Sequence, residues 1–367
     1  MEFIDLKTRL ATMRGALDER VAAVFEHGRY ILGPEVAELE EALAQYVGVK
    51  HCVGVASGTD SLLIALMALK VGPGDEVITV PYTWISSAEV IALAGATPVF
   101  VDIEKTTWNM DPTLLEAAIT KRTKAIMPVG IYGQTADMDP INEIAARHKL
   151  PVIEDAAQSF GATYRGKKSC ALSQIGSTSF FPSKPLGGFG DGGALFTDDD
   201  DLAEIFRQIR VHGQAGKHYH PIVGLNGRLD TLQAAMLLTA IEHFPAEIKQ
   251  RQQIAAQYDA LFSETNLPEV ELPQIAGNST SVYAQYTICS RERDVLHEKL
   301  KAADVPSVAY YSKPLHLQPV FENLGHQCGD FPVTESVAAT SLSLPMSAYL
   351  TEKDQIKVVR CIQDVYA

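Results

Sequence analysis

The chain has 367 residues, of which 46% are hydrophobic, and its formal net charge is -14. This length fits about two domains, and the composition is typical of a globular chain with sizeable apolar cores. Nucleic acids and anionic membrane surfaces attract basic proteins, so the acidic charge argues against both as main partners. An anionic ligand therefore needs cations that the chain supplies locally.

The cysteines and the N-terminal segment favour a cytoplasmic protein. The five cysteines are odd in number, widely spaced and free of any CxxC pair, so neither a disulfide framework nor a zinc cage is predicted. The first residues, MEFIDLKTRL, lack a basic start followed by an apolar core. No apolar run approaches the roughly 18 residues that a membrane span needs. We therefore expect no metal, no targeting segment and no membrane partner.

Helix and strand patterns alternate along the first half of the chain. Residues 34–47 are expected to form an amphipathic helix that Pro34 begins and Gly48 ends. Further helices are expected over residues 57–70, 84–95, 112–119 and 139–148, and strands over residues 51–56, 76–80, 97–103, 125–129, 151–155 and 194–197. Such alternation implies βαβ crossovers, and hence an α/β fold with a mainly parallel sheet covered by helices on both faces.

The pattern changes near residue 245. A long polar helix is expected over residues 247–262, and mixed strands and helices follow it. We therefore predict a large domain over residues 1–244 and a smaller C-terminal α/β domain over residues 245–367. The acidic run at residues 198–201 is expected at the start of a helix, where carboxylates complement the helix dipole; a metal site there is the alternative.

Polar clusters follow three of the expected strands, at the edge where parallel sheets bind ligands. Gly58 and Thr59, in SGTDSL, open a helix directly after a strand, where N–H groups and the helix dipole favour a phosphate. Simple capping of that helix by Ser57 or Thr59 is the alternative. Asp155, in EDAAQS, ends an apolar strand, so its carboxylate needs a partner. Lys184 stands between two prolines after the strand-like TSFF, and five glycines follow it in SFFPSKPLGGFGDGG.

The glycines after Lys184 imitate a dinucleotide motif. Gly188, Gly190 and Gly193 match GxGxxG, but that motif needs a helix after it, and residues 194–197 have the pattern of a strand. A Rossmann dinucleotide site is therefore not predicted. A phosphate cradle, a strand-end aspartate and a lysine are instead the groups that hold pyridoxal phosphate, whose aldehyde needs an amine and whose ring nitrogen must stay protonated.

Ordered motifs along nearly the whole chain resemble the DegT/DnrJ/EryC1/StrS family of sugar aminotransferases, which have fold type I of the pyridoxal phosphate enzymes. The motifs are FIDLK, HGRYILGPEVAELE, ASGTDSL, GPGDEVITVPYTW, GATPVFVDI, PVGIYGQTADMDPI, VIEDAAQSFGA, SFFPSKPLGGFGDGGALFT and GLNGRLDTLQAA. The resemblance implies a transaminase that uses pyridoxal 5'-phosphate. It also implies that Lys184 is the Schiff-base lysine and proton shuttle, and that Asp155 is the partner of the ring nitrogen.

The same resemblance assigns further cofactor contacts. Gln158 would bond the ring hydroxyl. Trp84 would stack on the ring, although a tryptophan after a strand is often a core residue. The phosphate would bind the Gly58 and Thr59 amides and the Ser179 hydroxyl.

Other residues are implied to reach the neighbouring subunit or the substrate. Asn226 would bind the phosphate in the neighbouring subunit, so the resemblance implies a homodimer with its sites at the interface. Arg228 is a candidate for an anionic substrate, with a solvated charge or an ion pair as the alternative. Tyr311 and His316 lie in AYYSKPLHLQP, which resembles the family's sugar-binding segment but has Tyr310 where the family often has histidine.

The residues after Lys184 resemble family members that act on carbon 3 of a nucleotide sugar, in which LG and GDGG follow the lysine. The chain is most similar to aminotransferases of O-antigen (lipopolysaccharide) pathways that use a UDP-linked 2-acetamido-3-keto-glucuronate, with L-glutamate as the implied donor. A dTDP-linked 3-keto-6-deoxyhexose as substrate stays open, and so does a sensor or regulator without catalysis on the same fold. Lys184 argues against a related sugar dehydratase, which has histidine in its place.

Overall fold

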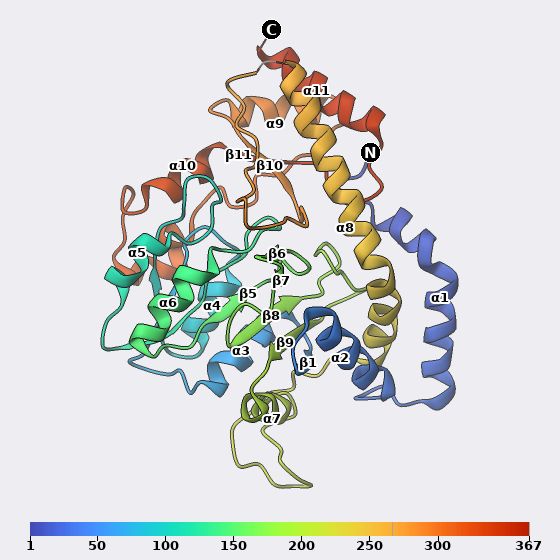
Figure 1. The fold of residues 1–367 in the computed structure, drawn as a ribbon, viewed down its shortest axis with the longest axis vertical. Helices are drawn as coiled ribbons and strands as arrows, with labels where there is room; N and C mark the ends of the chain where they lie inside the picture. The colour runs from blue at the N-terminus through green and yellow to red at the C-terminus, as the bar shows by residue number, and fades with distance from the viewer. Residues whose placement is uncertain (266, 367) are drawn as a thin grey trace.

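A central sheet and one long helix organise the chain in the computed structural model, which describes residues 1–265 and 267–366 (Figure 1). The α-helices are α1 (Leu6–His27), α2 (Pro34–Val47), α3 (Gly58–Ala68), α4 (Ser86–Leu93), α5 (Pro112–Ala118), α6 (Met138–His148), α7 (Asp200–Ile209), α8 (Thr231–Thr265), α9 (Arg293–Ala302), α10 (Pro332–Thr340) and α11 (Glu352–Tyr366). The strands are β1 (His51–Val55), β2 (Glu76–Thr79), β3 (Thr97–Phe100), β4 (Thr123–Ile126), β5 (Ile153–Asp155), β6 (Thr163–Tyr164), β7 (Lys167–Lys168), β8 (Ile175–Ser179), β9 (Gly193–Thr197), β10 (Tyr286–Cys289) and β11 (Ser341–Leu344). Two 3-10 helices are η1 (Leu315–Leu317) and η2 (Pro319–Leu324).

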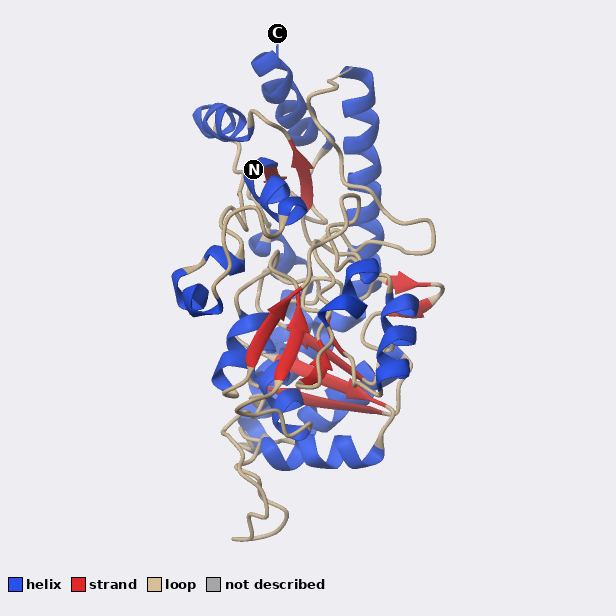
Figure 2. Cartoon of the chain, turned by 90° about the vertical axis from the view of Figure 1, so that its left-hand side faces the viewer, coloured by secondary structure: helices blue, strands red, loops and turns tan. Residues whose placement is uncertain are grey.

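The central sheet has the strand order β3-β2-β4-β5-β8-β9-β1. Its strands are among those drawn in red in Figure 2. Strands β3, β2 and β4 are parallel, β5 is parallel to β8, and bridges from Ile126 to Val152 and from Val129 to Asp155 join the two halves. Only β9 runs against its neighbours, β8 and β1. This arrangement confirms the predicted mainly parallel sheet. It also confirms that a strand, and not a helix, follows the GxGxxG match.

Alternate residues of the strands face two different apolar cores. Val53 and Val55 of β1 belong to a core that includes α3 and α7, whereas Cys52, the residue before Val53, belongs to a core that includes α2 and the first half of α8. Because neighbouring strand residues point to opposite faces, helices cover both faces of the sheet, as predicted.

The expected helix over residues 247–262 is part of a longer one, and the prediction of its start was wrong. Helix α8 begins at Thr231 and passes through Pro245, although an internal proline costs about 3 kcal/mol. Packing on both sides of the proline explains this tolerance, because Phe244 lies in the α2 core and Tyr258 lies in a separate core with β10, β11, α9 and α11. The predicted division into residues 1–244 and 245–367 therefore falls inside a helix, and it stays a prediction.

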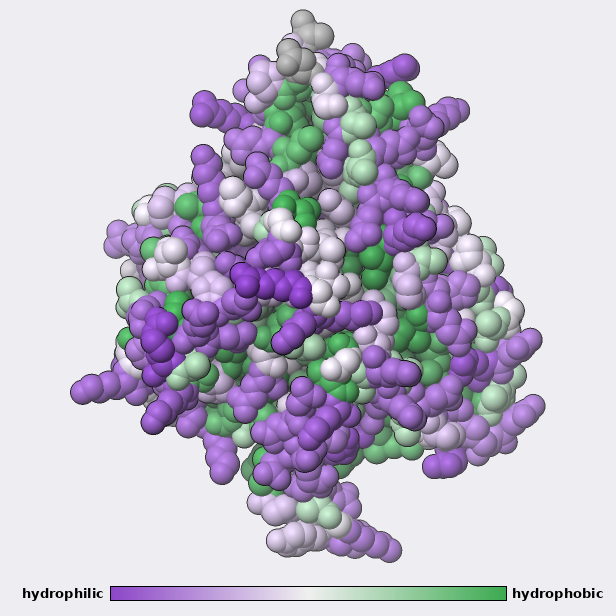
Figure 3. Space-filling model, viewed as in Figure 1, coloured by the Kyte–Doolittle hydropathy of each residue, from purple (hydrophilic) through white to green (hydrophobic). Residues whose placement is uncertain are grey.

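Polar side chains cover most of the face shown in Figure 3. The acidic run behaves as predicted, because the Asp199 carboxylate accepts hydrogen bonds of 2.9 and 3.0 Å from the backbone N–H groups of Asp201 and Leu202 at the start of α7. Within residues 1–265 and 267–366, none of the helices combines the length and the apolar character that crossing a membrane requires.

Candidate active site

Asp155 and the turn that carries Lys184 lie at the carboxyl ends of the paired strands β5 and β8. Asp155 ends β5 and is buried, and it accepts hydrogen bonds from the Ser87 hydroxyl (2.8 Å, to Oδ2) and from the Ala157 N–H (3.2 Å, to Oδ1). Burial raises the pKa of Asp155, while these two bonds and the charge of Lys184 oppose that rise. The sequence therefore predicted correctly that this carboxylate needs partners.

Lys184 lies in the turn between β8 and β9. Its backbone N–H donates to the Phe181 carbonyl at 2.8 Å, and its side chain is half-buried. Burial lowers the pKa of Lys184, and Asp155 opposes this shift. A lysine with a lowered pKa supplies the neutral amine that covalent chemistry needs.

The start of α3 forms a cradle beside the end of β8. The Ser57 side chain caps the helix by accepting a 3.0 Å hydrogen bond from the Asp60 N–H, so the capping that was the alternative to a phosphate site does occur. The N–H groups of Gly58 and Thr59 lie in the first turn of α3, before Asp60. N–H groups in a first turn have no hydrogen-bond acceptor within the helix. A Cβ on Gly58 would lie 2.6 Å from Cβ of Ser179, so a side chain would fill the cradle. Capping and anion binding are therefore compatible here.

Trp84 follows β2 and precedes α4. Its side chain is 58% exposed, which rules out the alternative of a core tryptophan. An exposed indole face beside the cradle helix is available for stacking on a planar ring. The adjacent helices are linked by the Thr59 and Ser86 hydroxyls, which lie 2.8 Å apart.

Gln158 is held from two sides. Its Oε1 accepts from the Tyr132 backbone N–H at 3.1 Å, and its Nε2 donates to the Tyr311 hydroxyl at 2.8 Å. Burial raises the pKa of Tyr311. The structure thus brings Tyr311, a predicted substrate residue, against Gln158, a predicted cofactor residue. A direct role of either residue stays a prediction.

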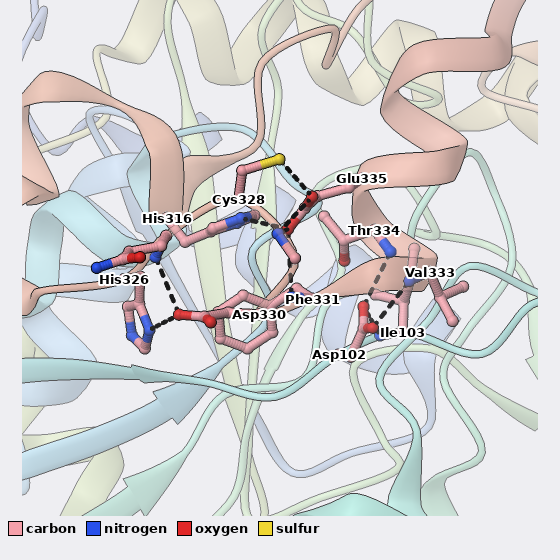
Figure 4. A network of polar contacts seen from close by, with 12 residues as sticks. Asp102, Ile103, His316, His326, Cys328, Asp330, Phe331, Val333, Thr334 and Glu335 are labelled. Carbon is pink, nitrogen blue, oxygen red and sulfur yellow. Dashed lines mark hydrogen bonds and ion pairs between the residues drawn. The ribbon is translucent and has the colours of Figure 1, made fainter.

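His316 is buried at one end of a polar network that reaches the surface (Figure 4). Its Nε2 lies 3.1 Å from Oε1 of Glu335, and its ring packs on Phe331 with ring centres 4.7 Å apart. Burial lowers the pKa of His316. Asp102, in the same view, accepts hydrogen bonds from the N–H groups at the start of α10. The described contacts of His316 do not include Lys184 or Asp155, and its role toward a sugar stays a prediction.

Asn226 and Arg228 lie on an extended segment beside β1. Val55 forms a bridge with Arg228, and the Ala56 N–H donates to the Gly227 carbonyl at 2.9 Å. Asn226 is exposed and Arg228 is half-buried. Residues two apart on an extended chain point to the same side, so both side chains leave this edge together.

Ser87 and Tyr132 contact predicted site residues but were missed by the sequence analysis. Ser87 is one of two adjacent serines in PYTWISS, and only the fold distinguishes the one that faces Asp155. Tyr132 contacts Gln158 through its backbone, which no side-chain pattern reveals. Its φ of 54° is an additional sign of a special position.

Comparison with known proteins agrees with this geometry. The model of the DegT/DnrJ/EryC1/StrS aminotransferase family matches residues 12–363. The chain belongs to this family. It is 52% identical, over 98% of each chain, to the UDP-2-acetamido-2-deoxy-3-oxo-D-glucuronate aminotransferase of Pseudomonas aeruginosa. It is 46% identical, over 99% of this chain and 98% of the relative, to the pleiotropic regulatory protein of Geobacillus stearothermophilus.

Solved structures of the family share the whole fold. An aminotransferase of the family from Brucella abortus superposes with a TM-score of 0.96 at 42% identity, over 100% of both chains. NtdA from Bacillus subtilis with bound cofactor PMP superposes with a TM-score of 0.91 at 30% identity, over 99% of this chain and 85% of that chain. Members of this family depend on pyridoxal phosphate, so membership confirms the predicted fold type, cofactor and transaminase class.

The site residues of this chain fit pyridoxal phosphate. The cradle at Gly58 has no room for a side chain, so its N–H groups stay accessible to a phosphate. Asp155 offers a buried carboxylate, and Trp84 offers an exposed ring. When bound, pyridoxal phosphate supplies an electron sink for the carbon that gains or loses nitrogen. Asp155 would hold the proton on the ring nitrogen, Lys184 would bind the aldehyde, and its freed Nζ would move a proton to or from the substrate carbon.

Proposed function

We propose that the chain transfers an amino group from L-glutamate to the keto group at carbon 3 of a UDP-linked 2-acetamido-3-keto-glucuronate. The observation that carries this proposal is the identity of 52% over 98% of both chains to the relative whose name states that keto sugar. The position of Asp155 and Lys184 after the paired strands β5 and β8 supports it. Such a product would enter O-antigen or lipopolysaccharide synthesis. The acidic charge and the scattered cysteines support a cytoplasmic enzyme.

The active form is proposed to be a homodimer in which Asn226 and Arg228 enter the partner's site. Asn226 is exposed in the single chain, and Tyr219 and Val223, on the segment before it, are 65% and 83% exposed. That segment extends below α7 in Figure 1. Exposed apolar side chains on an extended segment are typical of a surface that another chain covers.

Arg228 is the proposed partner of the sugar carboxylate. The chain carries a formal charge of -14, so an anionic sugar needs a local cation at the site. A guanidinium binds a carboxylate through two parallel hydrogen bonds, which favours arginine for this role. A dTDP-linked 3-keto-6-deoxyhexose, the alternative substrate, lacks this carboxylate.

The test compares the two keto sugars, with L-glutamate as donor, in wild type and in Arg228→Ala. We expect the wild type to prefer the glucuronate, and Arg228→Ala to lose about ten- to a hundredfold in kcat/KM for it alone, because a charged hydrogen bond contributes roughly 1.5 to 3 kcal/mol. Arg147→Ala, which removes an exposed ion pair with Glu116, is the control and should behave as wild type.

Three outcomes would contradict the proposal in different ways. A preference for the uncharged hexose would favour the alternative substrate. Equal losses on both sugars in Arg228→Ala would remove Arg228 from carboxylate recognition. No amino transfer to either sugar, with the cofactor bound, would favour the regulatory class to which the Geobacillus relative's name points.

A further inference from the structure

A buried guanidinium contacts the turn that carries Lys184. Nη1 of Arg9, on α1, donates a 2.6 Å hydrogen bond to the carbonyl of Gly187. The turn is tightly closed, because a Cβ on Gly187 would lie 2.2 Å from the Pro182 carbonyl oxygen. The Gly188 N–H also donates to the Phe180 carbonyl at 2.7 Å. Few conformations are therefore open to the segment between Lys184 and the carbonyl that Arg9 binds.

Arg9 is itself held by residues from two distant parts of the chain. Its Nε lies 3.0 and 3.3 Å from the two carboxylate oxygens of Glu247 on α8, and the Tyr349 hydroxyl donates to the same carboxylate at 2.9 Å. Arg9 is 7% exposed and Glu247 is 4% exposed. In Figure 1, α1 and α8 lie side by side, which agrees with these contacts. The turn is thus joined to α1, α8 and the C-terminal segment through one side chain.

A buried ion pair at this position costs desolvation free energy that apolar side chains would not. Desolvation of two charges offsets much of their attraction, and apolar residues of similar volume are often as good for stability. The apolar cores nearby show that the chain uses such residues freely. We infer that the pair fixes geometry, because a guanidinium sets the direction of the carbonyl it binds, which an apolar contact does not.

The cavity between Arg9 and Lys184 is too small for a substrate. The cavity is lined by Arg9, Lys184, Glu247 and Arg251 among others, and its volume is about 10 Å³. That space holds about one water molecule. Nη2 of Arg9 is buried without a partner in the described part of the chain, and one water would satisfy it. A sugar or an amino acid does not fit between Arg9 and Lys184.

We propose that Arg9, held by Glu247 and Tyr349, is a positioning residue that orients Lys184 through the carbonyl of Gly187. This inference rests on the proposed role of Lys184 as the reacting amine. Loss of the Arg9 contact frees the turn, so the Lys184 amine samples more orientations and more contact with water. The proton transfers that Lys184 performs become slower, while substrate binding by other elements is retained.

The test uses Arg9→Met, Arg9→Lys and Tyr349→Phe, with Arg14→Met as the matched control. Arg14 is also on α1 but forms an exposed ion pair with Asp18. The first readout is the pKa of Lys184 in the cofactor-free protein, from the pH dependence of its labelling by an amine reagent and peptide mass spectrometry. The second readout is kcat and KM for the keto sugar in the loaded enzyme.

We expect the Lys184 pKa to rise toward its ordinary value in Arg9→Met, and kcat to fall about ten- to a hundredfold with KM unchanged. Arg9→Lys, which keeps the charge, and Tyr349→Phe should show smaller changes in the same direction, and Arg14→Met should show none. If Arg9→Met does not fold, Tyr349→Phe carries the test.

Unchanged labelling and kcat beside a lowered Tm would show that Arg9 is only structural, and a raised KM with retained kcat would show a binding residue; either result overturns the proposal. The labelling readout needs no turnover. If the wild type transferred no amino group, the proposed function would fail, yet a shifted Lys184 pKa in Arg9→Met would still support the positioning role.

Discussion

The Ser87 hydroxyl donates a 2.8 Å hydrogen bond to Oδ2 of Asp155, and this contact joins the first turn of α4 to the end of β5. Ser87 is 1% exposed, so no water can easily replace it. The bond favours the ionised form of a carboxylate whose pKa burial raises. Ser87 therefore helps to keep Asp155 charged, and only a charged Asp155 can hold a proton on the ring nitrogen of the cofactor.

Ser87→Ala should raise the pKa of Asp155 further and lower kcat by about ten- to a hundredfold, because a hydrogen bond to a buried charge is lost. The acid limb of the kcat profile should shift to higher pH, since Asp155 then becomes protonated at a higher pH. Ser87→Thr keeps the hydroxyl and should restore the profile. Asp155→Asn, which removes the charge, should cost about 10³-fold or more. An Asp155→Asn enzyme with near-normal rates would refute the role of both residues.

Gly58→Ala should weaken cofactor binding at least about tenfold, because the new Cβ would lie 2.6 Å from Cβ of Ser179 and displace one wall of the phosphate cradle. Fluorescence titration of the cofactor-free protein with pyridoxal phosphate measures the Kd. Gly15→Ala, on α1, is the control, since no atom lies within 4 Å of its new Cβ. The control should keep the Kd and stabilise α1 by about 1 kcal/mol. An unchanged Kd in Gly58→Ala would place the phosphate elsewhere.

The strand ends could be predicted from the sequence because they follow runs of buried apolar residues. Asp155 stands at the end of the apolar run that forms β5, and Gly58 opens α3 soon after the apolar run that forms β1. The sequence pattern alone therefore located both residues. The contact of Arg9 with Gly187 joins residues 178 positions apart, and no local pattern carries such information. Pro245 is the opposite case, because its local preference against helix is overridden by packing on both sides of α8.

Glu154, the residue before Asp155, should make the stability of the cofactor-free protein depend on pH. It is 2% exposed, and burial raises its pKa to about 7. Its folded pKa is raised above the unfolded value of 4.5, so the folded state binds more protons between these two pH values. The stabilisation from the protonated carboxyl is therefore present below about pH 4.5 and is lost as the pH rises toward 7, by up to roughly 3 kcal/mol.

Glu154→Gln should remove this dependence, since the amide imitates the neutral acid. Its oxygen can accept from the Cys170 N–H and its nitrogen can donate to the Ser169 hydroxyl, the two groups that now contact the carboxylate at 2.8 Å. Urea unfolding at pH 5 and pH 8 measures the free energy of unfolding. The wild type should lose more stability than the variant between these pH values, and parallel losses would contradict the assignment.

Mixing two inactive variants tests whether the site is shared between subunits. Lys184→Ala and Asn226→Asp homodimers should each be inactive, but a heterodimer keeps one site with an intact Lys184 and an intact Asn226 from the other chain. Random exchange of subunits should therefore restore about a quarter of the wild-type activity. Exchange is verified by native mass spectrometry. Heterodimers that form without any activity would remove Asn226 from the partner's site.

The reacting amine is tested most directly by chemical trapping. The protein is loaded with pyridoxal phosphate, reduced with borohydride and digested, and mass spectrometry locates the lysine that carries the added mass. The described structure predicts Lys184, because burial lowers its pKa and its turn follows β8, the strand that pairs with the end of β5 at Asp155. Lys184→Ala, loaded and reduced in the same way, should carry no stoichiometric label and should transfer no amino group. A stoichiometric label on any other lysine of the wild type, with Lys184 unmodified, would contradict the account.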